Sequence, residues 1–190
     1  MKYQRSLYSF VLLFGSTLAW SVQAQQKLLP AQSEVSFVTK QMGVPVEGRF
    51  KRFDAQLNFD PTKPEAAKLG FTVDIASATL GSPEPDAELP KPTWFNTIKF
   101  PQATFQSNSV KSLGGGRFEV GGKLTIKGAT RDVTVPVALA QSGNMTTASG
   151  QITIKRLAFK IGEGEWSDTS MVADDVQVKF KLALAGVGKF

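Results

Sequence analysis

The sequence predicts an all-β domain of antiparallel strands, arranged as a sandwich or a barrel. Apolar and polar residues alternate with a period of two along most of the chain, as happens when successive side chains of a strand point to opposite sides of a sheet. Segments rich in glycine, proline and asparagine separate these alternating stretches at short intervals, which is typical of sandwiches and barrels. Each strand has one apolar and one polar face, and this favours antiparallel pairing over a parallel sheet that is buried on both sides.

The first 24 residues have the features of a secretory signal peptide. Lys2 and Arg5 precede the apolar residues 10–14, and small residues end the segment at Ala24. This order of positive charge, short apolar run and small residues is how a cleavable signal is built. The apolar run is shorter than the roughly 20 residues that a membrane span needs. We therefore expect cleavage after Ala24, export to the periplasm and one mature domain over residues 25–190.

The alternating segments divide the mature chain into about eight to ten strands. Gly114–Gly116 and Lys127–Gly128 are expected to form turns between strands. The pair Gly121–Gly122 lacks the following helix of a phosphate-binding loop and is instead expected to form a bulge or a sharp bend. The expected strands are residues 33–39, 53–59, 71–75, 102–110, 117–127, 133–139, 148–154, 157–161 and 176–184.

Residues 80–101 interrupt the strand pattern. This stretch holds five of the prolines, which disfavour a long helix but leave room for one helical turn at residues 93–97. Irregular stretches of this length are uncommon in compact domains and are usually functional. We expect a short helical or irregular flap, which serves either as a lid or as a structural cover for an open barrel end, with Trp94 and Phe95 at the mouth.

The chain contains no cysteine and no histidine, and this excludes much chemistry. Serine and cysteine catalysis that depends on histidine, a lipid anchor on cysteine and most transition-metal sites are ruled out. Acidic residues gather late in the chain, but their spacing matches no calcium loop, and acids in loops are ordinarily just solvated. We expect no catalytic site, no metal and no cofactor. The acids are Glu163, Glu165, Asp168, Asp174 and Asp175.

The interior is expected to be almost pure hydrocarbon. The mature segment keeps twelve phenylalanines and two tryptophans but no tyrosine, and the aromatic residues share faces with valine, isoleucine and leucine. Such aromatics form a core rather than a nucleic-acid surface. A closed sheet of about eight strands is either filled by its side chains or holds one bound molecule. The alternation does not separate these two cases, but any cavity would suit an apolar tail.

Several motifs in a fixed order resemble those of one known family. The chain resembles the YceI-like family of exported polyisoprenoid- and lipid-binding proteins over essentially the whole mature domain. The resemblance implies a lipocalin-like antiparallel barrel over residues 25–190, with a long apolar tunnel. The matching segments are residues 35–38, 46–50, 54–60, 94–96, 100–105, 122–128, 130–131 and 154–162.

The resemblance implies a periplasmic binding or carrier protein, not an enzyme, for a long-chain isoprenoid, a quinone-like lipid or a fatty amphiphile. The alternative is a filled barrel that acts as a protein-interaction module beside a membrane redox or stress-response system; an enzyme ranks third. A homodimer is left open, and neither a nucleic-acid partner nor a membrane span is expected. The expected ligand contacts are Phe37, Phe53, Leu57, Phe71, Val73, Trp94, Phe95, Phe105, Leu124, Ile126, Ile152 and Phe180.

Overall fold

The computed structural model describes residues 25–190, so the expected signal peptide, residues 1–24, lies outside the described residues. The described chain confirms the all-β antiparallel prediction, with eleven strands in one sheet. They are β1 (Lys27–Leu28), β2 (Glu34–Gln41), β3 (Val44–Phe50), β4 (Phe53–Asn58), β5 (Lys68–Asp74), β6 (Ala78–Thr79), β7 (Gln102–Gly114), β8 (Arg117–Ile126), β9 (Ala129–Ser142), β10 (Met145–Lys155) and β11 (Asp175–Ala185). The helical segments are η1 (Pro30–Gln32), η2 (Pro64–Ala66), η3 (Ile75–Ser77), α1 (Pro83–Glu88), η4 (Arg156–Phe159) and η5 (Gly164–Ser167).

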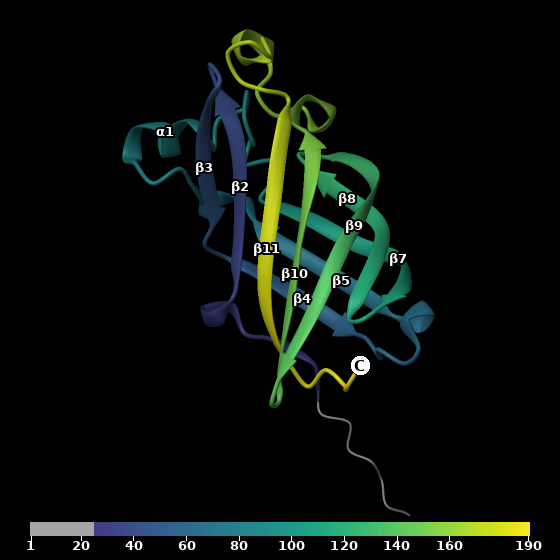
Figure 1. Ribbon diagram of the computed structural model, residues 1–190. Coiled ribbons are helices and arrows are strands. Elements are labelled where there is room, and N and C mark those ends of the chain that lie inside the picture. The colour runs from purple at the N-terminus through teal and green to yellow at the C-terminus, as the bar shows by residue number, and fades with distance from the viewer. Residues whose placement is uncertain (1–24) are drawn as a thin grey trace, which may run out of the picture.

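The sheet curls on itself into a half-barrel. Its strand order is β4-β5-β7-β8-β9-β10-β11-β2-β3-β6, with β1 added beside β11. Figure 1 shows β2, β11, β10 and β9 crossing in front of β4, β5 and β7, so the two halves of one sheet face each other. Within the described residues no ladder joins the edge strands β4 and β6. The turn after β3 instead bonds to η3, where the Arg52 amide donates to Ser77 Oγ at 2.9 Å.

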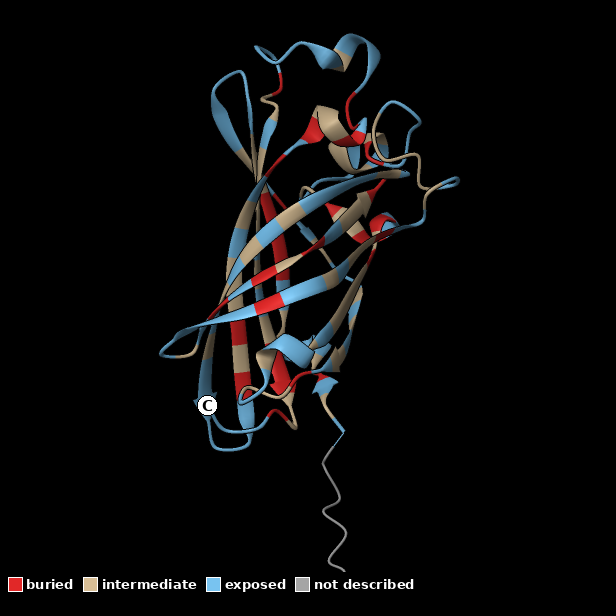
Figure 2. Cartoon of the chain, turned by 90° about the vertical axis from the view of Figure 1, so that its right-hand side faces the viewer, coloured by how far each residue is buried: buried red, intermediate tan, exposed pale blue. Residues whose placement is uncertain are grey.

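Burial follows the alternation that the sequence predicts. In β8 the even residues Phe118, Val120 and Ile126 are buried, whereas Arg117, Glu119 and Lys123 are exposed. Figure 2 shows the same banding of buried and exposed residues along the strands. A strand places alternate side chains on opposite faces. The buried set therefore forms one continuous inner wall.

The expected irregularity at Gly121–Gly122 occurs, with the extra residue on the partner strand. Ser107 pairs with Gly122 and Ser109 pairs with Gly121, so Asn108 of β7 is the bulged residue. A Cβ on Gly122 would lie 2.5 Å from the ring of Phe105. Glycine is needed here because the Phe105 ring crosses directly over the backbone of β8. The expected turn at Gly114–Gly116 is also present, with positive φ at all three residues.

One expected strand is absent. Residues 157–161 do not form a strand, because the chain leaves β10 through η4 and buries the side chain of Arg156 among backbone carbonyl groups. The sheet has eleven strands where about eight to ten were expected, since β3 lies outside the expected strands and β1 and β6 add two residues each. The flap contains a short helix, as expected, at Pro83–Glu88, and residues 93–97 form hydrogen-bonded turns.

Candidate functional site

The inner wall of the half-barrel surrounds a cavity of about 410 Å³. This volume lies in the range of about 300–1,000 Å³ that is usual for sites of small organic ligands. Residues from β2, β3, β4, β5 and all of β7 to β11 line it, and nearly all of them are aliphatic or aromatic. The interior is therefore hollow, which the sequence pattern alone left undecided.

Most of the residues expected to contact a ligand lie on the inner wall. All of the twelve except Phe53 line this one cavity. Phe53 begins the edge strand β4 and packs on Phe71, with the ring centroids 5.9 Å apart, rather than on the cavity. The residues brought together are Phe37, Leu57, Phe71, Val73, Trp94, Phe95, Phe105, Leu124, Ile126, Ile152 and Phe180.

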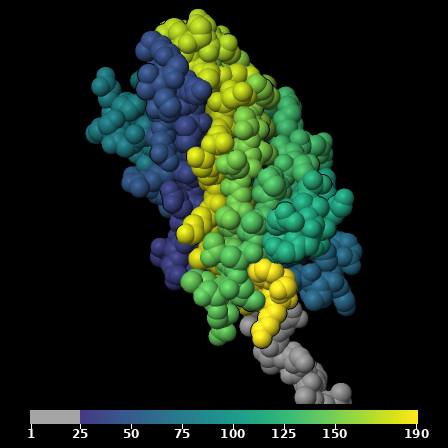
Figure 3. Space-filling view, viewed as in Figure 1, coloured from purple at the N-terminus to yellow at the C-terminus, as the bar shows by residue number. Residues whose placement is uncertain are grey.

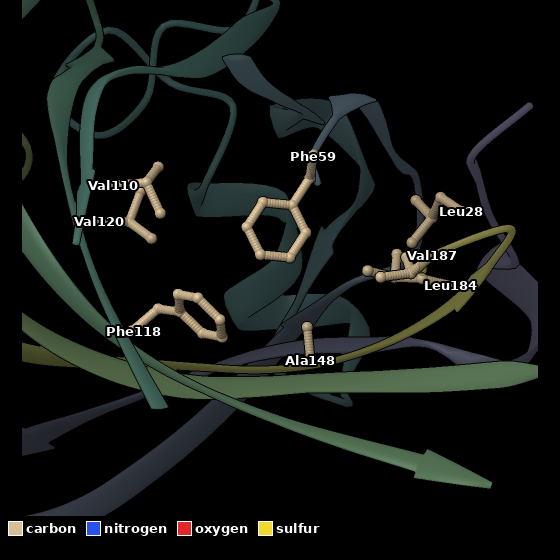
Figure 4. Close-up of a cluster of buried hydrophobic side chains, with 8 residues drawn as sticks. All are labelled: Leu28, Phe59, Val110, Phe118, Val120, Ala148, Leu184 and Val187. Atoms are coloured by element: carbon tan, nitrogen blue, oxygen red, sulfur yellow. The ribbon is translucent and has the colours of Figure 1, made fainter. Parts of the chain in front are cut away.

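One end of the cavity is closed by hydrocarbon. Figure 4 shows Phe59 facing Phe118 and Ala148 across this end, and the two phenyl rings meet edge to face at 5.3 Å. Leu28 and Val187 belong to the same buried cluster. The lining includes Gln26. Its side-chain amide bonds to the backbone of Phe59 in both directions, with the Phe59 amide donating to Gln26 Oε1 at 2.9 Å. The polar groups of the Gln26 side chain are therefore satisfied within the protein.

The other end is closed by residues 156–174, which we call the cap segment (Figure 1, yellow-green at the top). Arg156 holds it together, although its side chain is almost fully buried. Its guanidinium donates five hydrogen bonds of 2.7 to 3.1 Å, all to backbone carbonyls. The acceptors are the carbonyls of Ile161, Gly162, Trp166, Val172 and Ala173.

The charge of Arg156 therefore serves the fold rather than a ligand. A guanidinium has five N–H donors, and all five are used inside the cap segment. Burial lowers the pKa of Arg156, and the nearby Asp174 carboxylate partly offsets this effect. The sequence did not indicate this role of Arg156, because its hydrogen-bond partners are backbone carbonyls, which do not depend on the residue type.

Residues 80–101, the flap, form the remaining wall. Leu89 and Phe95 of the flap line the cavity, and Trp94 packs on Trp166 of the cap segment with ring centroids 5.5 Å apart. The Thr93 carbonyl accepts the Gly162 amide at 2.8 Å. The flap is therefore at least a structural cover, joined to the cap segment. Figure 3 shows the teal atoms of this part of the chain on the outer surface, beside the blue atoms of the strands that precede it.

Asp86 anchors the flap to the sheet. Its carboxylate accepts hydrogen bonds from the Thr79 hydroxyl and from the Leu80 amide. The Thr79 hydrogen bond, followed by the one from Leu80, lowers the pKa of Asp86 below its ordinary value. A charged carboxylate in α1 therefore holds this helix against the short strand β6.

Four of the five late acids are engaged in local structure, among them Asp175, which pairs with Lys155 at 2.6 Å. Glu163 pairs with the buried Lys127 at 2.9 Å, and Asp174 accepts the Leu157 amide. Asp168 caps a turn through Ser170, whose hydroxyl hydrogen bond lowers the pKa of Asp168. Within residues 25–190, no three acidic side chains lie close enough together to hold a metal ion. These four acids thus form partners of the cap segment and its neighbours rather than a common cluster.

Two buried polar atoms in the cavity lining have no hydrogen-bond partner among the described residues. They are Trp94 Nε1 and Thr39 Oγ1. The polar groups of Gln26 and Arg156 are directed into the protein backbone. The lining also includes the polar side chains of Gln41 and Glu88, of which Glu88 pairs with Lys91. The described part of the chain also has no helix with the length and apolarity of a membrane span. The geometry is that of an apolar binding cavity with very few polar contacts to offer.

A half-barrel of antiparallel strands around an apolar cavity defines a class of ligand-binding domain. Comparison of the sequence with known protein families identifies the family within this class. The YceI-like domain matches residues 26–184, and the chain belongs to this family. Protein YceI of Escherichia coli O157:H7 is 36% identical over 143 residues, which cover 70% of this chain and 74% of that protein. Matches to other curated relatives, named UPF0312 proteins, span only 50 to 56% of those proteins' lengths.

Two solved structures are similar in fold. The crystal structure of BcnA from Burkholderia cenocepacia has a TM-score of 0.80 and 48% identity, and the match covers 82% of this chain and 98% of that one. A polyisoprenoid-binding domain from Saccharophagus degradans has a TM-score of 0.69 at 16% identity, with 85% and 98% covered. The second likeness concerns the fold alone. The resemblance drawn from the sequence motifs is confirmed.

Proposed function

We propose that this protein is a periplasmic carrier that holds one long-chain apolar ligand, an isoprenoid or a lipid with a similar tail, inside the half-barrel. The observation that carries the proposal is the continuous hydrocarbon lining of the 410 Å³ cavity. The description of the S. degradans domain as polyisoprenoid-binding points to the same ligand class. Binding rather than catalysis is consistent with the family and with the absence of histidine and cysteine.

The energy available from such a cavity is sufficient. Burial contributes about 0.8 kcal/mol for each methylene group, so about ten methylenes supply about 8 kcal/mol. This corresponds to a gross dissociation constant of about 1 μM. A branched isoprenoid chain of four units carries more apolar groups than that. No hydrogen bond to the ligand is required for useful affinity.

Extraction of the native ligand is the first test. The protein is purified after export, denatured and extracted, and mass spectrometry is used to search the extract for a lipid at about one molecule per chain. Size-exclusion chromatography of the purified protein before denaturation shows whether the carrier is a monomer or a homodimer. An empty extract, together with no binding of added geranylgeraniol, refutes the carrier proposal.

A matched pair of variants tests the cavity itself. Val135 lines the cavity, whereas Thr134, the preceding residue of β9, is exposed on the outer face. Val135→Trp is expected to fill part of the cavity and weaken geranylgeraniol binding at least tenfold. Thr134→Trp adds the same ring outside and should leave binding unchanged. Fluorescence of Trp94 and Trp166 in the parent protein follows the titration, and a radiolabelled ligand serves for the variants.

A further inference from the structure

Exposed apolar side chains gather at the cap end of the barrel. Met42 and Val44 are 70% and 63% exposed at the turn between β2 and β3, and Met171 of the cap segment is 43% exposed. The Met42 amide donates to the Met171 carbonyl at 2.7 Å, so the turn and the cap segment lie side by side. Figure 1 shows both at the same end of the molecule. We call Met42, Val44 and Met171 the tip patch.

The local backbone does not explain this choice of residues. Met42 has φ of 48° and Gly43 has φ of 82°, which is a tight hairpin turn with two left-handed residues. Asparagine, aspartate and glycine are the residues that favour such positions. Methionine here gains neither burial nor a conformational preference. A side chain that serves neither the turn nor the core points to an interaction outside the chain.

The tip patch adjoins the cavity. Gln41 and Val172 line the cavity and form a bridge between their backbones. They are the immediate chain neighbours of Met42 and Met171. Whatever covers the tip patch is therefore held against the cap end of the cavity.

We propose that the tip patch docks on the surface of a lipid bilayer and brings the cap end of the cavity to the membrane that holds the ligand. This inference rests on the proposed carrier function. A stable protein interface buries about 800 Å² on each partner, from about 20–30 residues, and three side chains fall far short of that. A bilayer needs only a few apolar side chains at the boundary between head groups and acyl chains.

Local charge does not add to this fit. Lys40 and Lys160 are exposed at the cap end, but so are Glu163, Glu165 and Asp168 of the cap segment. Charges of both signs are therefore mixed around the tip patch, and a surface of this kind has no net attraction for an anionic bilayer. The apolar side chains carry the proposed contact, and binding is expected on neutral as well as on anionic vesicles.

Vesicle flotation tests the proposal. The exported protein is mixed with vesicles of phosphatidylethanolamine and phosphatidylglycerol, or of phosphatidylcholine alone, and the floated fraction is measured. The double variant Met42→Asn with Met171→Ser removes two apolar side chains, and its asparagine suits the left-handed turn. We expect its partition onto vesicles to fall about tenfold or more. Val44→Thr, which keeps the β-branched shape, should produce a smaller fall.

The control lies at the other end of the sheet. Leu113 is 49% exposed at the end of β7, and Leu113→Ser should float as the parent protein does. The docking proposal is wrong if the parent protein does not float with the vesicles, or if the parent and all variants float alike. It is also wrong if the tip patch binds another protein and the parent does not float.

Geranylgeraniol binding without vesicles separates the two proposals. The tip-patch variants should keep the parent's affinity for it, because the substituted side chains lie outside the cavity. Parent protein that binds geranylgeraniol but no vesicles refutes docking alone. Parent protein that floats but binds no isoprenoid refutes the carrier function and leaves the membrane contact standing.

Discussion

Replacement of Arg156 by methionine should destabilise the protein strongly. The arginine side chain is 1% exposed and donates all five of its hydrogen bonds to carbonyls of the cap segment. Methionine fills a similar volume but leaves five buried acceptors without donors. Hydrogen bonds to charged groups contribute about 1.5–3 kcal/mol each, but the cap segment can turn some carbonyls to water. We expect a loss of about 4 kcal/mol, the range found when a buried charge network is broken.

Urea unfolding followed by circular dichroism measures this loss. A typical domain has about 5–15 kcal/mol of stability, so the midpoint should shift far more than for a surface substitution. Arg131→Met is the matched control, because Arg131 is exposed and bonds only to the carbonyl of its neighbour Thr130. Amide hydrogen exchange should show the largest loss of protection at residues 161–173. An Arg156→Met protein within about 1 kcal/mol of Arg131→Met would refute this account of the cap segment.

Three further substitutions test the fold. Thr146 is fully buried and its hydroxyl has no partner among the described residues, so Thr146→Val should stabilise the protein by about 1 kcal/mol in urea unfolding. Gly122→Ala should cost about 2 kcal/mol in the same assay, because its methyl group would lie 2.5 Å from Phe105. The folded-state pKa of Asp86 is lowered by Thr79, so its contribution is complete above about pH 4 and is lost below it. Asp86→Asn should therefore show a flatter fall of melting temperature between neutral and acid pH than the parent.

The sequence pattern predicts faces better than it predicts shape. Period-two alternation fixes which side of a strand a residue occupies, and this is why Leu124 and Ile126 of β8 both reach the cavity. It does not say where a strand ends relative to the cavity. Phe53 shares a face with Leu57, but it lies at the start of the edge strand β4 and packs on Phe71 instead.

The hollow interior and the cap segment were beyond sequence reasoning for physical reasons. Whether a curled sheet is filled depends on its curvature, which in turn depends on features such as the bulge at Asn108 opposite Gly121–Gly122. The cap segment depends on Arg156, which has the inward parity of Ile152 and Ile154 but lies beyond the strand expected at residues 148–154, so the alternation was not extended to it. The guanidinium of Arg156 is surrounded by backbone carbonyls from residues 161–173. Every residue type has a backbone carbonyl, so the sequence contains no signal for these contacts.

The few polar groups of the cavity bear on which ligands it can select. Gln26 at one end and Arg156 at the other both line the cavity, and both direct their hydrogen bonds to backbone groups of the protein. A charged head group drawn into the hydrocarbon would lose its hydration, which costs several kcal/mol or more without a partner. A ligand of the proposed kind must therefore keep a charged head outside or carry an uncharged one. Selection among ligands then depends on the length and shape of the tail, which a hydrocarbon wall can distinguish, and on whether the ligand offers a partner to Trp94 Nε1 or Thr39 Oγ1, which have none among the described residues.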